Sequence, residues 1–202
     1  MNEQLNYRKK MAAQTRQLIL DAAIELFHKY GYENVTIKNI VNKTGMSRGS
    51  FYAHFKDKDD LLCSAIFEDL DNDYLRYYNL RLRSNDQMSP LEALRCFLLE
   101  VNRLITKNGA NLLRHYYGYT ISHSDILLRQ DRHYFTILSE LISKCRSDKL
   151  IKECLNEDHI FEAILMTERI IAIEWSMRNG ELPISSWNYL IYALIEYISA
   201  DA

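Results

Sequence analysis

Residues 36–55 read TIKNIVNKTGMSRGSFYAHF, and this stretch predicts two short helices joined by a tight turn. Thr36 is a favourable N-cap, because its hydroxyl can accept a hydrogen bond from an unpaired amide at a helix start. Ile40 and Val41 follow at helical spacing and supply an apolar face. Gly45 can adopt the left-handed backbone conformation with which a helix ends. The stretch is therefore predicted to be a helix-turn-helix.

The second helix of this motif combines a buried face with an outward face suited to DNA. Ser47 is predicted to cap it. Phe51 and Phe55 lie four residues apart, so both are expected to point inward. The residues predicted to face outward are Arg48, Ser50, Tyr52 and His54. A guanidinium, a hydroxyl, a phenol and an imidazole on one short helix suit the phosphates and base edges of a major groove.

A longer series of residues at fixed spacing surrounds this motif. Its members are Ala22, Ala23, Leu26, Phe27, Gly31, Tyr32, Thr36, Ile37, Ile40, residues 45–49, residues 51–55, Lys58, Leu61 and Leu62. The series covers roughly the first quarter of the chain and resembles the N-terminal domain of the TetR family of bacterial transcriptional regulators. Val41 and Thr44 depart from the resemblance, because alanine is usual in the family at both places.

The resemblance implies DNA contacts for nine residues. They are Thr36, Lys38, Ser47, Arg48, Gly49, Ser50, Tyr52, His54 and Lys58. Arg48 is the expected base reader, since a guanidinium can bond O6 and N7 of guanine together. Lys58 is expected to hold a phosphate beside the N-terminus of the next helix. For Tyr52 a packing role, and for His54 a surface position without DNA contact, remain alternative interpretations.

The distribution of charge favours the same interpretation. Residues 1–56 contain nine Lys or Arg and four Asp or Glu, a net charge of +5, whereas residues 57–202 contain 16 and 23, a net charge of −7. A basic head on an acidic body favours one unit that faces a polyanion. We therefore expect a DNA-binding domain at 1–56 and a helical regulatory domain, for effector binding and dimerisation, at 57–202. The basic segment 8–10 is expected to be flexible, either reaching DNA or remaining solvated.

With six Gly, two Pro and no alternating strand pattern, the chain is predicted to be all-α. Beyond the motif, helices are expected near 12–30, 57–83, 90–107, 110–122, 125–147, 157–179 and 185–200, with a short helical turn at 148–155. No run of 18 apolar residues and no signal peptide are found, so we expect a cytoplasmic protein without a membrane span. Four cysteines without C-x-x-C spacing are interpreted as reduced core residues rather than a redox switch: Cys63, Cys96, Cys145 and Cys154.

The regulatory body is rich in aromatic residues, which suggests a chamber for a small-molecule effector between helices. The candidate lining residues are Tyr77, Phe97, Arg114, His115, Tyr116, Tyr117, Tyr134, Phe135, Glu168 and Trp175. An ordinary packed core is the alternative interpretation for each aromatic residue among them. The family resemblance implies that an effector bound in the body would shift the long helix that starts near residue 57. This shift would change the distance between the two DNA-binding domains of the dimer.

The last two helices resemble the dimerisation helices of the same family, through a pattern that runs from Ile164 to Gly180. The helix from Ile160 to Trp175 is apolar nearly all round. The final helix carries an apolar stripe made of Trp187, Leu190, Ile191, Leu194 and Ile198. A chain of this size has too little core to cover both, so a homodimer is expected, and its target should be an inverted repeat in double-stranded DNA.

Signatures of an enzyme are missing from the sequence. We find no nucleophile elbow, no phosphate-binding loop and no H-E-x-x-H motif. His115, His123 and His133 are not spaced to share one helix face, so no metal site or cofactor is predicted. A helical interaction module with no DNA role is the other alternative, but it leaves the basic head unexplained.

Overall fold

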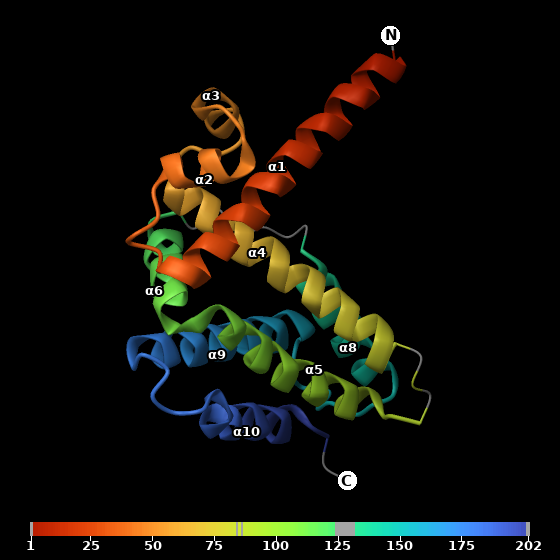
Figure 1. Cartoon of the computed structure of the whole chain (residues 1–202). Helices are drawn as coiled ribbons and strands as arrows, with labels where there is room; N and C mark the ends of the chain where they lie inside the picture. Colours follow the sequence, from red (N-terminus) through yellow and green to blue (C-terminus); the bar gives the residue numbers. More distant parts are fainter. Residues whose placement is uncertain (1, 84, 86, 124–131, 201–202) are drawn as a thin grey trace.

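The computed structural model describes residues 2–83, 85, 87–123 and 132–200 and is built of helices (Figure 1). The head comprises α1 (Asn2–Tyr30), α2 (Ile37–Thr44) and α3 (Arg48–Tyr52). The body comprises α4 (Lys58–Tyr77) with a π-helical turn (Tyr78–Leu82), α5 (Pro90–Ile105) with a 3-10 turn (Thr106–Asn108), α6 (Gly109–Ser122), α8 (His133–Ser147), α9 (Glu157–Met177), a 3-10 turn (Ile184–Trp187) and α10 (Asn188–Ile198). The described residues form no β-strand, and the predicted all-α class is confirmed.

The helix starts are fixed by the side chains that the sequence indicates. Thr36, Ser47 and Asp57 accept hydrogen bonds from the backbone amides of Asn39, Ser50 and Asp60, and they cap α2, α3 and α4. Gly45 ends α2 in the left-handed conformation, with φ 68°. Ser89 caps α5, with Pro90 in its first turn. Each cap satisfies amides or carbonyls that a helix end leaves unpaired.

The long helix α4 joins the head to the body. Its start packs against α1, and further along it packs against α5, α6 and α8. Leu62, Ile66, Leu70 and Tyr74, the predicted apolar row, are all buried. Figure 1 shows α4 running from the head into the body, with α10 at the end of the molecule opposite α3. The helix α4 therefore connects the head physically to the helices of the body.

The N-terminal segment differs from the prediction. The expected flexible stretch 8–10 is part of α1, which begins at Asn2 instead of residue 12. No Gly or Pro interrupts residues 2–30, and the good helix formers there allow the helix to propagate. Figure 1 shows this end of α1 projecting away from the other helices.

Three other element predictions need correction. The second helix of the motif ends at Tyr52, so His54 lies in the following turn rather than on the helix. The expected helical turn at 148–155 is irregular: Ile151 pairs with Ser199 in an isolated antiparallel bridge, which fixes this segment against the C-terminus. The helix expected from 125 begins at His133, after an extended Arg132, and residues 124–131 lie outside the described part of the chain.

The four cysteines are free thiols. Cys63 and Cys145 are buried as expected, and burial raises the pKa of both thiols to about 12. Cys96 is half-buried, whereas Cys154 is exposed, because the segment that carries it is a turn and not a helix. Among the described helices, none has the length and apolar character needed to cross a membrane.

Candidate DNA-binding surface and ligand chamber

The turn between α2 and α3 is held by local hydrogen bonds. Thr36 and Asn39 form a reciprocal capping box, in which the Thr36 amide donates to Asn39 Oδ1 at 2.8 Å and the Asn39 amide donates to Thr36 Oγ1 at 3.3 Å. The Gly45 amide donates to the Asn42 carbonyl, and the Ser50 amide donates to Ser47 Oγ at 3.0 Å. These hydrogen bonds fix the start of α3 relative to α2, and so they fix the direction in which the outward side chains of α3 point.

Phe51 and Phe55 anchor α3 in the head core, with exposed fractions of 0% and 2%. Arg48 is exposed, and Tyr52 keeps 57% of its surface exposed although its ring meets the Phe51 ring edge-on at 5.3 Å. That exposure argues against a packing role for Tyr52. His54 is half-buried beside Phe55.

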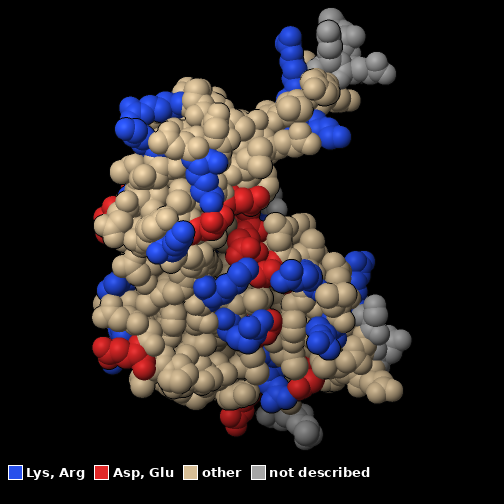
Figure 2. Space-filling model, viewed as in Figure 1, with Lys and Arg blue, Asp and Glu red and all other residues tan. Residues whose placement is uncertain are grey.

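The remaining predicted DNA contacts divide into two groups. The exposed ones are Thr36, Lys38, Ser47 and Gly49. Ser50 is half-buried, with its hydroxyl 3.6 Å from the sulfur of Met46. Figure 2 shows Lys and Arg side chains on the upper part of the molecule, where α1–α3 lie, and basic and acidic side chains mixed over the part below it.

Lys58 has an internal role that the sequence did not indicate. Its ammonium group donates to the carbonyl oxygens of Tyr32 and Val35 at 2.9 and 3.0 Å, and it lies 4.0 Å from the centre of the Tyr32 ring. Two of its three donors therefore tie α4 to the loop between α1 and α2. Its contact with phosphate remains a prediction, for which one donor is left.

We predict that Thr36→Ala lowers the free energy of unfolding by about 1 kcal/mol, because the side-chain oxygen that accepts the Asn39 amide is lost, while the backbone amide of residue 36 can still donate to Asn39 Oδ1. Thermal melting against the matched variant Thr106→Ala measures the difference, since the Thr106 hydroxyl donates to the Arg103 carbonyl at the end of α5. Equal melting curves for the two variants would show that the Thr36 hydroxyl contributes nothing to stability.

A small chamber lies between α4, α5, α6, α8 and α9, with a volume of about 60 Å³. Five predicted pocket residues line it: Tyr116, Tyr117, Tyr134, Phe135 and Glu168. The lining also includes Tyr74, Asn102, Arg132 and Arg169, which the sequence interpretation missed as pocket residues. Asn102 carried a usable signal, since it follows Val101 on the otherwise apolar face of α5.

The other predicted pocket residues lie elsewhere. Phe97 is buried behind the chamber wall, where its ring stacks on that of Tyr134 at 5.9 Å. Tyr77 and Trp175 line a separate surface depression beside α5. Arg114 donates to the side chain of Asn179 at 2.6 Å. His115 lies against the head, with its ring 4.3 Å from that of Tyr32.

A buried carboxyl group dominates the electrostatics of the chamber. Glu168 is 8% exposed, and the hydroxyl of Tyr134 donates to its Oε2, while its Oε1 has no hydrogen-bond partner among the described residues. Burial raises the pKa of Glu168 to about 8, although the hydrogen bond from Tyr134 and the charge of Arg132 act in the opposite direction. Burial therefore favours the neutral, protonated form of Glu168.

Arg132 lines the chamber and makes cation–π contacts with three aromatic rings. Its guanidinium lies 4.4 Å from the centre of the Phe67 ring, 5.5 Å from that of Phe135 and 5.8 Å from that of Tyr134. Stacking of this kind stabilises a cation without a carboxylate partner. The Nε of Arg132, in contrast, is buried without a hydrogen-bond partner among the described residues.

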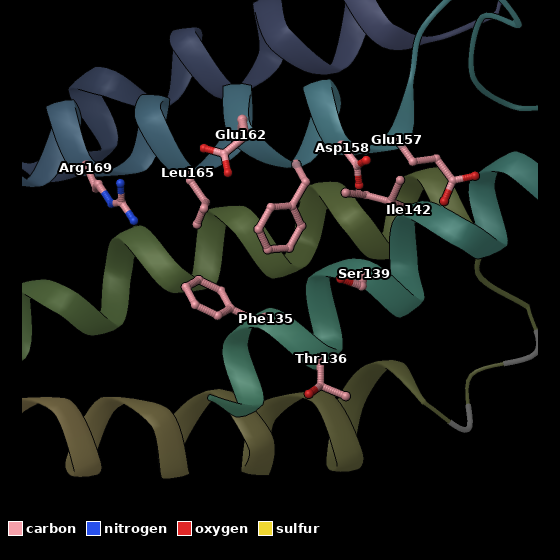
Figure 3. Close-up of a pocket in the computed structure, with 10 residues that line it drawn as sticks. Phe135, Thr136, Ser139, Ile142, Glu157, Asp158, Glu162, Leu165 and Arg169 are labelled. Atoms are coloured by element: carbon pink, nitrogen blue, oxygen red, sulfur yellow. The ribbon is translucent and has the colours of Figure 1, made fainter. Parts of the chain in front are cut away.

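A larger open groove of about 570 Å³ lies outside the chamber, between α8 and α9 (Figure 3). Its lining consists of Phe135, Thr136, Ser139, Ile142, Glu157, Asp158, Phe161, Glu162, Leu165 and Arg169. Phe135, Leu165 and Arg169 line both spaces, so the groove and the chamber adjoin. Figure 3 shows that side chains of α8 and α9 face each other across it.

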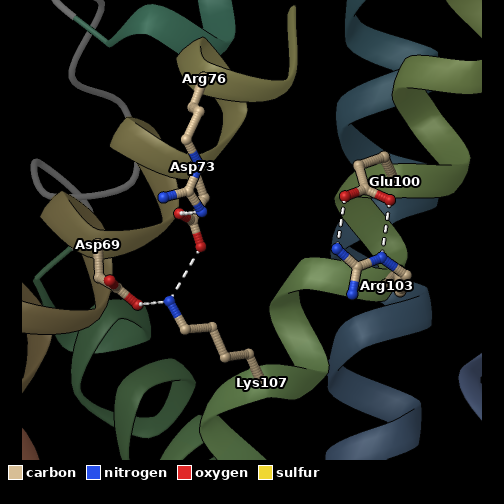
Figure 4. Close-up of polar contacts among 6 residues, drawn as sticks. All are labelled: Asp69, Asp73, Arg76, Glu100, Arg103 and Lys107. Carbon is tan, nitrogen blue, oxygen red and sulfur yellow. Dashed lines mark hydrogen bonds and ion pairs between the residues drawn. The ribbon is translucent and has the colours of Figure 1, made fainter. Parts of the chain in front are cut away.

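Several contacts connect α4 and the head to the other helices of the body, and three of them are polar or stacking contacts near the chamber or the head. The Asp71 carboxylate of α4 accepts the amides of His133 and Tyr134 at 2.9 and 3.0 Å, and so caps α8 from another helix. Lys107 bridges Asp69 and Asp73 of α4 at 2.8 and 2.9 Å (Figure 4). In the third contact, the ring of His115 in α6 packs against the ring of Tyr32 in the head. Nε2 of His115 also lies 3.2 Å from a carboxylate oxygen of Glu33.

The described residues contain no group of three or more side chains suited to hold a metal ion. The geometry instead offers an exposed arginine and tyrosine on a short helix, and a small chamber between the helices of the body.

The chain is similar to known regulatory proteins. Residues 19–65 match the bacterial regulatory proteins of the tetR family. The chain is 30% identical over 169 residues to the HTH-type transcriptional regulator AcrR of Shigella flexneri, covering 82% of this chain and 75% of that one. It is 44% identical over 59 residues to an HTH-type transcriptional repressor of Mycobacterium tuberculosis, covering 29% of this chain and 31% of that one.

Solved structures share the fold over nearly the whole length. Thermus thermophilus FadR in complex with lauroyl-CoA superposes with a TM-score of 0.66 at 17% identity, covering 93% of this chain and 96% of that one. Bacillus subtilis FadR in complex with stearoyl-CoA gives a TM-score of 0.62 at 21% identity, covering 90% and 98%. The helix-turn-helix at residues 36–55, the helical body behind it and the similarity to AcrR over most of both chains lead to one conclusion: this protein belongs to the TetR family of transcriptional regulators and is not an enzyme.

Proposed function

We propose that this regulator is a repressor that binds an inverted-repeat operator as a homodimer and is released by a small-molecule effector. The supporting observation is the exposure of Arg48 and Tyr52 on α3 above the buried Phe51 and Phe55. In this proposal residues 1–56 read DNA and residues 57–202 bind effector and partner. Because its target is the chromosome, we also propose that the protein acts in the cytoplasm.

On DNA, we propose that α3 enters the major groove of each half-site. Arg48 reads a guanine, Gly49 lets the backbone approach closely, and Tyr52 bonds a phosphate while its ring meets a thymine methyl. The residues proposed to contact phosphate or sugar are Thr36, Lys38, Ser47, Ser50, His54 and Lys58. Arg8, Lys9 and Lys10, all exposed on the projecting part of α1, add attraction to the phosphate backbone.

For the dimer, we propose an interface formed by α9 and α10. Met166, Ile170 and Met177 recur along α9 at helical spacing and are 62%, 58% and 64% exposed. Tyr189 and Tyr197 of α10 are 58% and 60% exposed. Exposed apolar side chains gathered on two neighbouring helices indicate an interaction surface, and a twofold axis lets each copy cover the other.

Ile170→Asp should convert the dimer into monomers at micromolar concentration, because a twofold interface would bury two unpaired carboxylates. Analytical ultracentrifugation gives the mass directly. Leu80→Asp is the matched control, since Leu80 is 75% exposed on the π-helical turn after α4 and should leave the dimer intact. Dimers of both variants, or monomers of both, would contradict the proposed interface.

For release, we propose that an effector in the chamber moves α6 and α8 and thereby α4. Tyr116 and Tyr117 of α6 line the chamber, and the adjacent His115 contacts Tyr32 of the head. Asp71 connects the first turn of α8 to α4. The effector must prefer the conformation that fits DNA poorly, so DNA must weaken effector binding by the same factor.

The proposal is tested by selecting genomic fragments with the purified protein and footprinting those that it retains. We expect two protected half-sites of inverted symmetry, about one helical turn apart or somewhat more. A single protected site, or protection without symmetry, would contradict the dimeric mode of binding. Retention of all fragments alike would contradict sequence-specific regulation.

A further inference from the structure

We propose that His115 is a positioning residue of the DNA-binding head, and that its protonation strengthens operator binding by tying α6 to the loop between α1 and α2. The inference rests on the proposed function, since it adds the proton to the effector as a signal that reaches the head through α6. It predicts that operator affinity rises as the pH falls from 8 to 6, and that this one side chain is responsible.

The first support is the residue that His115 touches. The Tyr32 ring is buried and lies 5.1 Å from the Phe27 ring in the head core, centre to centre. Its hydroxyl donates to Asp59 Oδ1 at 2.5 Å, and the Lys58 ammonium lies 4.0 Å from its ring centre, so the start of α4 holds it as well. The ring centre of His115 is 4.3 Å from that of Tyr32. Tyr32 is therefore the residue on which α1, α4 and α6 converge.

The second support is a carboxylate beside the imidazole. Nε2 of His115 lies 3.2 Å from Oε1 of Glu33, the residue that follows Tyr32 in the head loop. A neutral imidazole carries a proton on only one ring nitrogen, whereas a protonated imidazole donates from both. Protonation therefore turns this contact into a charge-assisted hydrogen bond. Thr36, which caps α2, is only three residues further on, so the contact acts next to the start of the helix-turn-helix.

The charged surroundings favour a positive imidazole. The titratable or charged side chains at this contact are Tyr32 and Glu33 of the head, Asp57, Lys58, Asp59 and Asp60 at the start of α4, and Arg114 and Tyr119 of α6. Burial, followed by the charges of Asp57 and Asp60, raises the pKa of Tyr119 to about 12, so the negative potential of the α4 start reaches α6. Lys58 and Arg114 oppose this potential less, because head carbonyls and a side chain on another helix end already accept from them.

The size of the effect follows from exposure. The side chain of His115 is 27% exposed and that of Glu33 is 71% exposed, so solvent screens their attraction. A partly exposed ion pair changes an equilibrium by up to about fivefold, and we expect about threefold for each chain. The proposed dimer contains two such contacts, so the operator affinity should change by about tenfold. Added salt should reduce the change.

The direction follows from the proposed route of release. An effector in the chamber moves α6, and this movement draws His115 away from Tyr32 and Glu33. Protonation of His115 opposes the movement, so it favours the head position that fits DNA. His115 itself does not line the chamber, whereas Glu168 and Arg169 of α9 do. The proton and the effector therefore act on α6 at different places.

The test is fluorescence anisotropy of the full-length protein with the selected operator at pH 6 and pH 8, at constant ionic strength. The ratio of the two affinities is measured for each variant, so that other histidines, which all variants share, contribute equally. The wild-type ratio should exceed that of His115→Phe by about tenfold. Phe keeps a ring against Tyr32 but cannot gain a charge.

His115→Arg should restore tight binding at both pH values, because a guanidinium is always charged and can both stack on Tyr32 and pair with Glu33. Its ratio should equal that of His115→Phe, while its affinity at pH 8 should exceed that of the wild type. Glu33→Gln should lower the ratio as His115→Phe does. His123→Gln is the matched control, since it removes an exposed histidine from the end of α6, and it should keep the wild-type ratio.

A second measurement needs no DNA. At pH 6, Glu33→Gln should lower the melting temperature more in the wild-type background than in His115→Phe, because only the wild type contains the charged pair. At pH 8 the substitution should have the same effect in both backgrounds. These melting curves also check that every variant is folded.

Equal affinity ratios for the wild type and His115→Phe would overturn the inference, and so would a His115→Arg variant that binds no better than His115→Phe at pH 8. A melting effect of Glu33→Gln that does not depend on residue 115 at pH 6 would also overturn it. Operator binding with any of these results contradicts only this inference. A wild-type protein that selects no operator at either pH contradicts the proposed function and the inference with it.

Discussion

Arg48→Ala should weaken operator binding by about 2–6 kcal/mol for the dimer, because each half-site loses one bidentate contact worth about 1–3 kcal/mol. The side chain of Arg48 is exposed in the first turn of α3, and no hydrogen bond or ion pair to it occurs among the described residues. Its removal should therefore leave the head folded. Fluorescence anisotropy with the selected operator, and with duplexes changed one base pair at a time, measures the effect.

The pattern of the loss matters as much as its size. The wild-type protein should discriminate at one base pair per half-site that Arg48→Ala no longer distinguishes. Lys9→Ala is the matched control, since Lys9 is an exposed basic residue of the projecting part of α1; it should weaken all duplexes alike. A uniform loss across sequences for Arg48→Ala would show that Arg48 contacts only phosphate.

Asp71→Ala should lower the free energy of unfolding by about 2–6 kcal/mol. The carboxylate is 8% exposed and accepts both the His133 and the Tyr134 amide. Its loss leaves two donors unpaired at the start of α8, each at a cost of about 1–3 kcal/mol, and removes a negative charge from a helix N-terminus. Chemical denaturation monitored by circular dichroism measures the change.

Two further variants distinguish the loss of these hydrogen bonds at the start of α8 from the mere loss of a negative charge on α4. Asp71→Asn keeps one carbonyl oxygen as an acceptor and should lose about half as much stability. Asp69→Ala removes a half-exposed carboxylate that pairs with Lys107 and should cost no more than about 1 kcal/mol. If Asp71→Ala and Asp69→Ala unfold at the same denaturant concentration, Asp71 does not hold α8.

The head could be predicted from the sequence because its determinants are local. Thr36, Gly45, Ser47 and Asp57 act on backbone groups within four residues, and all four behave as predicted. The exception is Lys58, whose partners Tyr32 and Val35 lie more than 20 residues away along the chain. Spacing along one helix carries no information about such partners.

The chamber was less predictable, because its members come from five helices whose rotations are set by packing. Tyr134 and Glu168 were named individually, but only the structure shows the hydrogen bond between them. Arg114 and His115 follow one another on α6 next to Tyr116, and helical rotation turns them toward Asn179 and toward the head. The role of Asp71 depends on the position of a helix that starts 62 residues later.

The most direct test of the central claim is anisotropy of a labelled operator duplex, titrated with protein at several salt concentrations. The account predicts sequence-selective binding of two chains per duplex, weakening steeply with salt as phosphate contacts release counterions. Scrambling one half-site should reduce the affinity strongly. Binding that is insensitive to salt, or equal affinity for the intact and the half-scrambled duplex, would contradict a dimer that reads an inverted repeat through α3.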